Sequence, residues 1–530
     1  MDSATLNRIL ERAAVAGVPP AVVEAARTSP AGLARLAQLL NPPVAAEPDG
    51  LPDFVKQHIT DAKHAFVEEE KRPLFRPPPS NREQAEHGLA AQRAAIIKAD
   101  AKNEVTALLS FTGLPRSFSD KALEELTPIT FDEMLVSQTH KGSYLLCRLI
   151  SVPTQQLSLG MIAEDVTGRA EYVGIYHFPV HGVKTGPDLD ALFPLGQVLA
   201  IKEPTFKMNP SNTSALIRVD SPADVVFLSQ NSPFLRDVEW KTPNPARLLP
   251  ASFDHKARGN SYFRQAKYLL AVRAYAEGVD AAPSDEQKLL LLLNRAQAHL
   301  LLRNFASARQ EAFSVQALLA DDVGAPPLTQ VKAQFRLARA LEGMRLFAAA
   351  KEAYHALCVI EPTSVEGKEG EKRIEEVLRT AKTGEFDFEA FEQDRAEWAA
   401  GTFFERAVGD FFGPIKVKKM AEREGGRGIV ATRDIEAGEL LVVEKAVAVG
   451  QQNLHCNTVV SLFDLRDNRA VTAGQSELLS TVIAKMMDDR SVIEQVYALC
   501  GGKDCPAPGE AVLGSFSRRS PDSPPPFERP

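Results

Sequence analysis

The alternation of hydrophobic and polar positions changes character several times along this chain of 530 residues. Residues 1–45 are rich in alanine and leucine at helical spacing and are broken by prolines, which predicts two or three short helices. Residues 46–135 carry charged helical segments, interrupted by the linker-like stretch Arg76-Pro77-Pro78-Pro79. We therefore expect an N-terminal helical segment followed by a helical, charged linker region.

Residues 136–235 change to short runs of β-branched and aromatic residues, separated by Gly, Pro, Asn and Asp. Five or six strands in about ninety residues predict a small barrel or sandwich, with a spacing similar to that of an OB-like barrel. An oligonucleotide-binding barrel would interleave aromatic and basic residues on exposed strands. Tyr172, Tyr176 and His177 have only a few lysines near them, so a scaffold is favoured over nucleic-acid binding.

Residues 250–385 contain three helical repeats. Each repeat has a small residue in its first helix and an alanine twelve positions later: Gly259 and Ala271, Ala296 and Ala308, Ala338 and Ala350. Small residues allow the two helices of a hairpin to approach closely. The pattern resembles three tetratricopeptide (TPR) repeats, which implies an α-helical solenoid whose first helices line a concave face.

Five polar residues are expected on that face: Lys256, Asn260, Asn294, Lys332 and Arg336. Three cations and two amides suit a pair of carboxylates, because Asn can donate through its NH₂ group and Arg through its guanidinium fork. The set resembles the two-carboxylate clamp with which some TPR domains hold the acidic C-terminal tails of Hsp70 and Hsp90 chaperones. The resemblance implies such a tail as a partner. The alternative is that these are ordinary surface residues of helical repeats.

The stretch from Glu422 to Val449 predicts a glycine-rich turn, a strand, a polar turn and another strand. It resembles the N-terminal part of a SET domain, the fold of S-adenosylmethionine-dependent protein-lysine methyltransferases, and is similar to SMYD-like and fungal TPR-plus-SET proteins. The resemblance implies that Gly426, Arg427 and Gly428 bind S-adenosylmethionine. It also implies a histone or another protein lysine as the substrate. We expect a partial SET domain over residues 410–506.

Residues 450–530 lack the elements that the resemblance leads us to expect for methyl transfer. They contain no Asn-His pair, and Tyr497 stands in a helical context, so no catalytic residue is predicted. Zinc is not predicted either, because the four candidate ligands lack the paired spacing of structural zinc sites: His455, Cys456, Cys500 and Cys505. Residues 507–530 are rich in Pro, Ser and Gly and are expected to be disordered.

Composition limits the remaining possibilities. A net charge of −8 argues against a broad nucleic-acid surface, and no apolar run approaches the length of a membrane span. The five scattered cysteines fit a reducing compartment, hence the cytoplasm or the nucleus.

The expected fold is multidomain α+β, and two functional hypotheses remain. The chain is either a SET-type methyltransferase whose catalytic half is missing from this sequence, or a non-catalytic adaptor that binds acidic tails.

Overall fold

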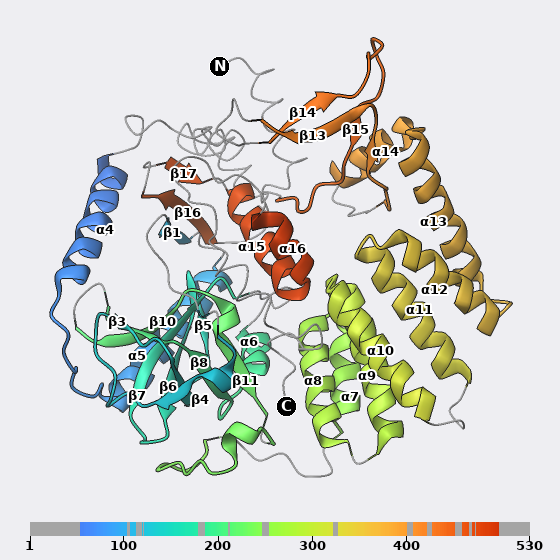
Figure 1. Ribbon diagram of the computed structural model, residues 1–530. Helices are drawn as coiled ribbons and strands as arrows, with labels where there is room; N and C mark the ends of the chain where they lie inside the picture. The colour runs from blue at the N-terminus through green and yellow to red at the C-terminus, as the bar shows by residue number, and fades with distance from the viewer. Residues whose placement is uncertain are drawn as a thin grey trace. The chain divides into compact units, whose positions relative to one another are not determined.

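The computed structural model (Figure 1) describes residues 53–102, 106–112, 119, 121–178, 186–209, 213–229, 231–245, 254–282, 284–321, 327–399, 406–420, 427–450, 458–465, 469–471 and 473–497. The chain forms two compact units. The first unit comprises residues 1–291 and 450–530, and the second comprises residues 292–449. The predicted helices of residues 1–45 and the predicted disordered tail of residues 507–530 lie outside the described residues.

The first unit contains a ten-stranded sheet. Its main path runs in the order β11 (Val225–Leu228), β8 (Val198–Lys202), β4 (Ser143–Leu149), β6 (Ser158–Asp165), β7 (Ala170–Tyr176), β10 (Ala215–Val219), β9 (Thr205–Met208) and β3 (Gln138–Thr139). Two further strands, β2 (Thr127–Ile129) and β5 (Thr154–Gln155), pair with β4 and β6.

This path has two ends among the described residues, β11 and β3, and no pairing joins them. Most neighbours are antiparallel, whereas β7–β10 and β2–β4 are parallel. The α+β class is confirmed, but the predicted OB-like barrel is not. The sheet also has ten strands where the sequence pattern predicts five or six, because short strands such as β3 and β5 leave little alternation to detect.

Both faces of the central strand β4 are buried, which follows from the period of two along a strand. Leu145 and Cys147 point into the main core, which α6 (Gly186–Leu192) helps to cover. Tyr144 and Leu146 point into a second core on the opposite face. The helix α5 (Arg82–Ala101) adds Leu89 to a smaller cluster against the sheet.

The proline-rich stretch that the sequence marks as linker-like lies against this sheet. The guanidinium of Arg169, whose side chain is 6% exposed, donates to the Pro77 carbonyl at 3.2 Å. The backbone NH of Val136 donates to the Phe75 carbonyl at 2.9 Å. These contacts fix the segment between α4 (Asp53–Lys71) and α5 on the sheet.

A smaller sheet in the first unit joins distant parts of the sequence. Strand β1 (Thr106–Thr112) pairs in parallel with β16 (Thr458–Asp464), which pairs with β17 (Arg469–Val471). Val55 and Ile59 of α4 pack against Phe463 and Leu465 of this sheet region. Helices α15 (Ala473–Asp488) and α16 (Arg490–Tyr497) follow, so residues 458–497 of the predicted SET segment lie in the first unit.

A TPR-like series of helices follows the large sheet. It comprises α7 (His255–Arg264), α8 (Tyr268–Ala281), α9 (Asp285–Leu302), α10 (Phe305–Asp321), α11 (Pro327–Gly343), α12 (Phe347–Ile360), α13 (Val365–Thr383) and α14 (Phe388–Ala399). The five alanines predicted at helix contacts are all 0% exposed. A Cβ at Gly259 would lie 2.3 Å from the Tyr275 ring, so only glycine fits there.

The first helical hairpin, α7 and α8, shares a core with the large sheet. Leu270 of α8 is 2% exposed and belongs to the cluster that contains the sheet residues Leu199 and Val225. The Lys267 ammonium lies 2.6 Å from the Asp188 carboxylate of α6. The first hairpin is therefore part of the first unit, and the boundary between the units falls within α9.

The second unit ends in two small strand pairs, β12 (Phe411–Phe412) with β15 (Val442–Val443) and β13 (Ile415–Lys419) with β14 (Arg427–Ala431). Gly384 ends α13 in the left-handed region, with φ at +75°. The Phe411 ring lies against it and against Phe386. Within the described ranges, every helix is too short or too polar to cross a lipid bilayer.

Candidate functional site

Three of the five predicted peptide-binding residues lie in the second unit. Asn294 is on α9, and Lys332 and Arg336 lie one turn apart on α11. The Arg336 Nε donates to the side-chain oxygen of Gln297 at 3.3 Å, and Gln297 follows Asn294 by three residues on α9. Residues three apart share a helix face, so the polar faces of α9 and α11 adjoin.

The other two predicted residues lie in the first unit, on α7. Lys256 is exposed and Asn260 is half-buried. The Tyr275 hydroxyl donates to Oδ1 of Asn260 at 2.8 Å. Because the oxygen accepts this bond, the donating NH₂ group of Asn260 points to the opposite side of the amide. Lys256 and Asn260 are four apart and share one side of α7.

Arg339 extends the cationic face of α11 and is not among the predicted site residues. Lys332, Arg336 and Arg339 follow a spacing of four and then three, which places them in one stripe. The Arg339 side chain is 47% exposed and lies 3.1 Å from the Glu342 carboxylate. The same spacing rule, continued one step past Arg336, would have identified Arg339 from the sequence.

Glu342 is shared between Arg339 of this stripe and partners on other helices. Arg373 of α13 donates to both of its oxygens, at 2.7 and 2.8 Å, and the Tyr354 hydroxyl donates at 2.5 Å. Burial alone would raise the pKa of Glu342, but the bonds from Arg373 and Tyr354 hold it below the ordinary value. One carboxylate thus serves two arginines, Arg339 of α11 and Arg373 of α13.

The predicted cofactor-binding turn is only partly described. Gly426 and the side chain of Arg427 lie outside the described residues, whereas Gly428 stands in β14 opposite Lys418. A Cβ on Gly428 would lie 3.0 Å from Cγ of Met420, a flexible side chain. The backbone of Gly428 therefore lies close to the Met420 side chain, which could move to accommodate a larger residue.

A cavity of about 480 Å³ lies at the other end of the same hairpin. It is lined by Thr383, Gly384, Phe411, Gly413, Pro414, Thr432, Arg433, Glu439 and Leu440. The register pairs Lys419 with Arg427 near the turn and Ile415 with Ala431 near the cavity. Four residues of strand separate these pairs, a distance of roughly 13 Å. The cavity is therefore separate from the turn of residues 426–428 at which cofactor binding is predicted.

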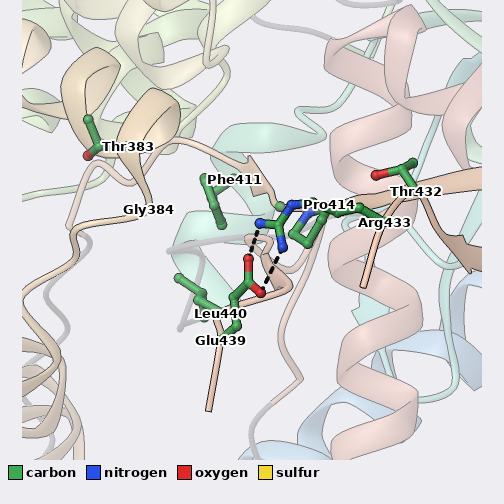
Figure 2. A pocket seen from close by; sticks show the side chains of 9 residues that line it. Thr383, Gly384, Phe411, Pro414, Thr432, Arg433, Glu439 and Leu440 are labelled. Atoms are coloured by element: carbon green, nitrogen blue, oxygen red, sulfur yellow. Dashed lines mark hydrogen bonds and ion pairs between the residues drawn. The ribbon is translucent and has the colours of Figure 1, made fainter. Parts of the chain in front are cut away.

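The charged groups in the cavity wall neutralise each other. Arg433 and Glu439 face one another in a two-pronged ion pair, one contact of which is 3.1 Å (Figure 2). The pairing lowers the pKa of Glu439 and raises that of Arg433. With Phe411, Pro414 and Leu440 beside them, the wall suits an uncharged or apolar group better than an ion.

The four candidate zinc ligands, His455, Cys456, Cys500 and Cys505, lie outside the described residues. Within the described ranges, no three His, Cys, Asp or Glu side chains gather closely enough to hold a metal ion. Tyr497 is the last residue of α16.

Comparison with known proteins finds relatives for most of the chain, although no protein-family model matches it. A protein of Gibberella zeae named Methyltransferase is 25% identical over 415 residues, which covers 76% of this chain and 54% of that protein. The chain therefore spans about half the length of this relative. RNA polymerase II-associated protein 3 of Mus musculus is 30% identical over 123 residues, 23% of this chain and 17% of that protein.

Solved structures similar to this chain include TPR domains of the same associated protein. The first TPR domain of Spaghetti (RPAP3), bound to the Hsp90 peptide SRMEEVD, is 30% identical, with 24% of this chain and 90% of that chain covered and a TM-score of 0.21. The second TPR domain of the human protein, in complex with the Hsp70 peptide SGPTIEEVD, is 23% identical, with 24% and 95% covered and a TM-score of 0.21. The chain is thus similar in sequence to a fungal methyltransferase over most of its length and to a TPR protein over about a quarter.

Proposed function

We propose that the helical repeats of this chain bind the acidic C-terminal tail of an Hsp90- or Hsp70-type chaperone. The observation that carries the proposal is the bond between Arg336 and Gln297, which joins the cationic stripe of α11 to the amide-bearing face of α9. The resemblance of the five residues to a two-carboxylate clamp and the sequence similarity to RNA polymerase II-associated protein 3 support it.

The chemistry of the groove suits a peptide that ends in two carboxylates. Lys332 and Arg336 supply charge, Arg336 in a planar fork, and the amides of Asn260 and Asn294 supply neutral donors. A tail that ends in Glu-Glu-Val-Asp presents a side-chain and a terminal carboxylate on one residue. We expect binding in the micromolar range, about −7 to −8 kcal/mol.

The test is a fluorescence-anisotropy titration of the full chain with a labelled peptide ending in Glu-Glu-Val-Asp. Lys332→Ala with Arg336→Ala should abolish binding, and amidation of the peptide terminus should weaken it. Lys351→Ala with Arg379→Ala is the matched control, because it removes the same charge from residues that pair with Glu375, Glu376 and Glu385. Equal affinity of the α11 double variant and the wild type would overturn the proposal.

The second candidate function is that of a SET-type protein-lysine methyltransferase acting on a histone or another protein, in the cytoplasm or nucleus. The fungal relative named Methyltransferase and the SET-like stretch of residues 422–449 favour it. In that case Gly426, Arg427 and Gly428 would contact S-adenosylmethionine, and the cofactor would supply the methyl group. The one tyrosine of residues 450–530, Tyr497, stands in a helix and not in the sequence context expected for a tyrosine that lines a lysine channel.

This second candidate is tested with labelled S-adenosylmethionine, histones and cell lysate. We expect the purified full chain to transfer no more label than its Gly428→Asp variant. Calorimetric titration with the cofactor alone separates binding from transfer. Transfer clearly above the variant would show that these residues suffice for the reaction.

A further inference from the structure

The hairpin of β13 and β14 exposes a pair of apolar residues on one face. Val417 of β13 lies directly opposite Ile429 of β14 in the register. The two residues are 61% and 65% exposed. Opposed apolar side chains in a sheet are stabilised by neighbours on the same face. Among the described residues, nothing covers this pair, so the face is open to a partner.

The outer edge of β13 presents backbone groups that do not pair with β14. The Thr432 NH donates to the Pro414 carbonyl at 2.9 Å, which makes these two residues a hydrogen-bonded pair. Such pairs alternate along an antiparallel ladder with pairs that are not hydrogen-bonded. Val417, three residues past Pro414, therefore directs its NH and C=O away from β14. In the described ranges, β14 is the only strand that pairs with β13.

Two lysines stand beside Val417 in the strand. Lys416 and Lys418 are exposed, and neither forms an ion pair with another described residue. Because side chains alternate along a strand, both lysines lie on the face opposite to that of Val417. The edge thus offers a cation, an apolar side chain with free backbone groups, and a second cation in succession.

The lysines select which strand can pair with this edge. Antiparallel pairing of two β13 strands centred on Val417 would set Lys416 of one copy against Lys418 of the other. Like charges directly opposite are destabilising, and lysines on edge strands prevent self-association in this way. A strand with acidic residues at the same two positions would instead be attracted. The charges therefore disfavour a second copy and favour an acidic partner.

We propose that the outer edge of β13 binds an extended segment of a partner protein in which an apolar residue stands between two acidic residues. The apolar residue exchanges backbone hydrogen bonds with Val417, and its acidic neighbours pair with Lys416 and Lys418. In this mode of strand addition, the backbone bonds supply affinity and the alternating side chains supply specificity.

Two features separate this site from other surfaces. A lipid membrane would match apolar and cationic side chains, but its hydrocarbon could not satisfy the directional backbone groups of Val417. The proposed chaperone-tail clamp uses residues of α7, α9 and α11 and a terminal carboxylate, whereas this edge recognises the interior of an extended segment. Neither proposal depends on the other.

The first test is a fluorescence-anisotropy titration of the full chain with the labelled peptide Thr-Thr-Glu-Val-Glu-Thr-Thr. Its C-terminus is amidated, so it lacks the terminal carboxylate that the clamp requires. Saturable binding is expected. Lys416→Glu with Lys418→Glu should weaken it by roughly tenfold or more and should allow Thr-Thr-Lys-Val-Lys-Thr-Thr to bind instead. Lys368→Glu with Lys372→Glu is the matched control, since it reverses two exposed charges of α13, and should change neither affinity.

The second test probes the backbone pairing and needs no protein variant. N-methylation of the central valine of the peptide removes the NH that faces β13 and should abolish binding. N-methylation of the glutamate that follows removes an NH that faces away and should change the affinity by no more than about twofold. Equal effects of the two modifications would show that the peptide does not pair as a strand.

The remaining outcomes distinguish the other occupants of the edge. Absence of saturable binding, or equal affinity of the acidic peptide for the wild type and the Lys416/Lys418 charge-reversal variant, would overturn the proposal. Binding to phosphatidylserine vesicles without binding to the peptide would make the edge a membrane contact and would overturn it too. So would self-association, measured by sedimentation velocity, that competes with the peptide, because a second copy would then occupy the edge.

Discussion

The hydroxyl of Tyr275 on α8 donates to the side-chain oxygen of Asn260 on α7, at 2.8 Å. The Tyr275 ring occupies the space that the missing side chain of Gly259 leaves open. A residue that packs the two helices together therefore also orients an amide of the proposed peptide clamp. Gly259 consequently has a role in the proposed binding face as well as in helix packing.

Removing this hydroxyl tests the link between packing and binding. Tyr275→Phe keeps the ring but loses the bond that holds Asn260, so we expect roughly two- to tenfold weaker binding of a peptide ending in Glu-Glu-Val-Asp. Tyr354→Phe is the matched control, because Tyr354 covers Gly370 in the same way but bonds to Glu342. Anisotropy titration measures both. Equal effects of the two variants would remove Asn260 from the clamp.

Leu270 should couple the first helical hairpin to the large sheet. Leu270→Ala removes a side chain that is 2% exposed in the shared core, which should cost about 2–4 kcal/mol. Amide hydrogen exchange should then increase in α8 and also in β8 and β11. Leu357→Ala, in the separate core of the second unit, should affect only α10 to α13. Exchange confined to α7 and α8 in the Leu270 variant would contradict the shared core.

Gly384 should hold the terminal strands of the second unit against α13. Gly384→Ala places a side chain at φ +75° and only 2.7 Å from the Phe411 ring, whereas Gly438→Ala at φ +89° meets nothing within 4 Å. Both variants carry the backbone cost of about 1–2 kcal/mol. Trypsin should therefore cut after Lys416 and Lys418 faster in the Gly384 variant. Similar rates in the two variants would show that the ring contact does not secure these strands.

Asp224 should make the first unit more stable as the pH falls below neutrality. Burial raises its pKa to about 6, although Lys202 and the NH of Ser119 oppose the shift. The folded state therefore binds a proton at a pH where the unfolded state does not. The resulting gain develops between about pH 7 and pH 4 and is on the order of 2–3 kcal/mol.

The control for this pH effect is Asp224→Asn, which has no proton to bind at the site. Hydrogen exchange in β8 and β11, measured from pH 7.5 to pH 4, should favour the wild type increasingly as the pH falls. Parallel pH profiles for the two proteins would show that the carboxylate titrates normally.

The repeats are the part of the fold that local sequence determines best. Ala296 and Ala338 are fully buried at the helix contacts where their spacing places them. Such contacts lie within one hairpin, so a short window of sequence records them. For the clamp residues, the sequence predicts only which of them share a face of the same helix. The contact between Arg336 and Gln297 depends on how successive repeats stack. The spacing of residues within one helix does not predict it.

The sheet and its attachments depend on distant partners that local patterns do not record. The Arg76–Pro79 stretch has the composition of a linker, yet the buried Arg169 and the NH of Val136 bond to its backbone region. Leu270 has the periodicity of any repeat helix, and only the structure shows that its neighbours include strand residues.

The parallel pairing of β1 with β16 affects how the protein is made. Thr106 leaves the ribosome about 350 residues before its partner Thr458. At a synthesis rate of about 5–20 residues per second, β16 follows β1 after roughly 20 to 70 s. Until then, β1 and the apolar face of α4 lack the strand that covers them. The large sheet and the repeats can be complete by then, so this small sheet closes last. During synthesis, the exposed strand and helix are the surface on which the nascent chain most needs protection from aggregation.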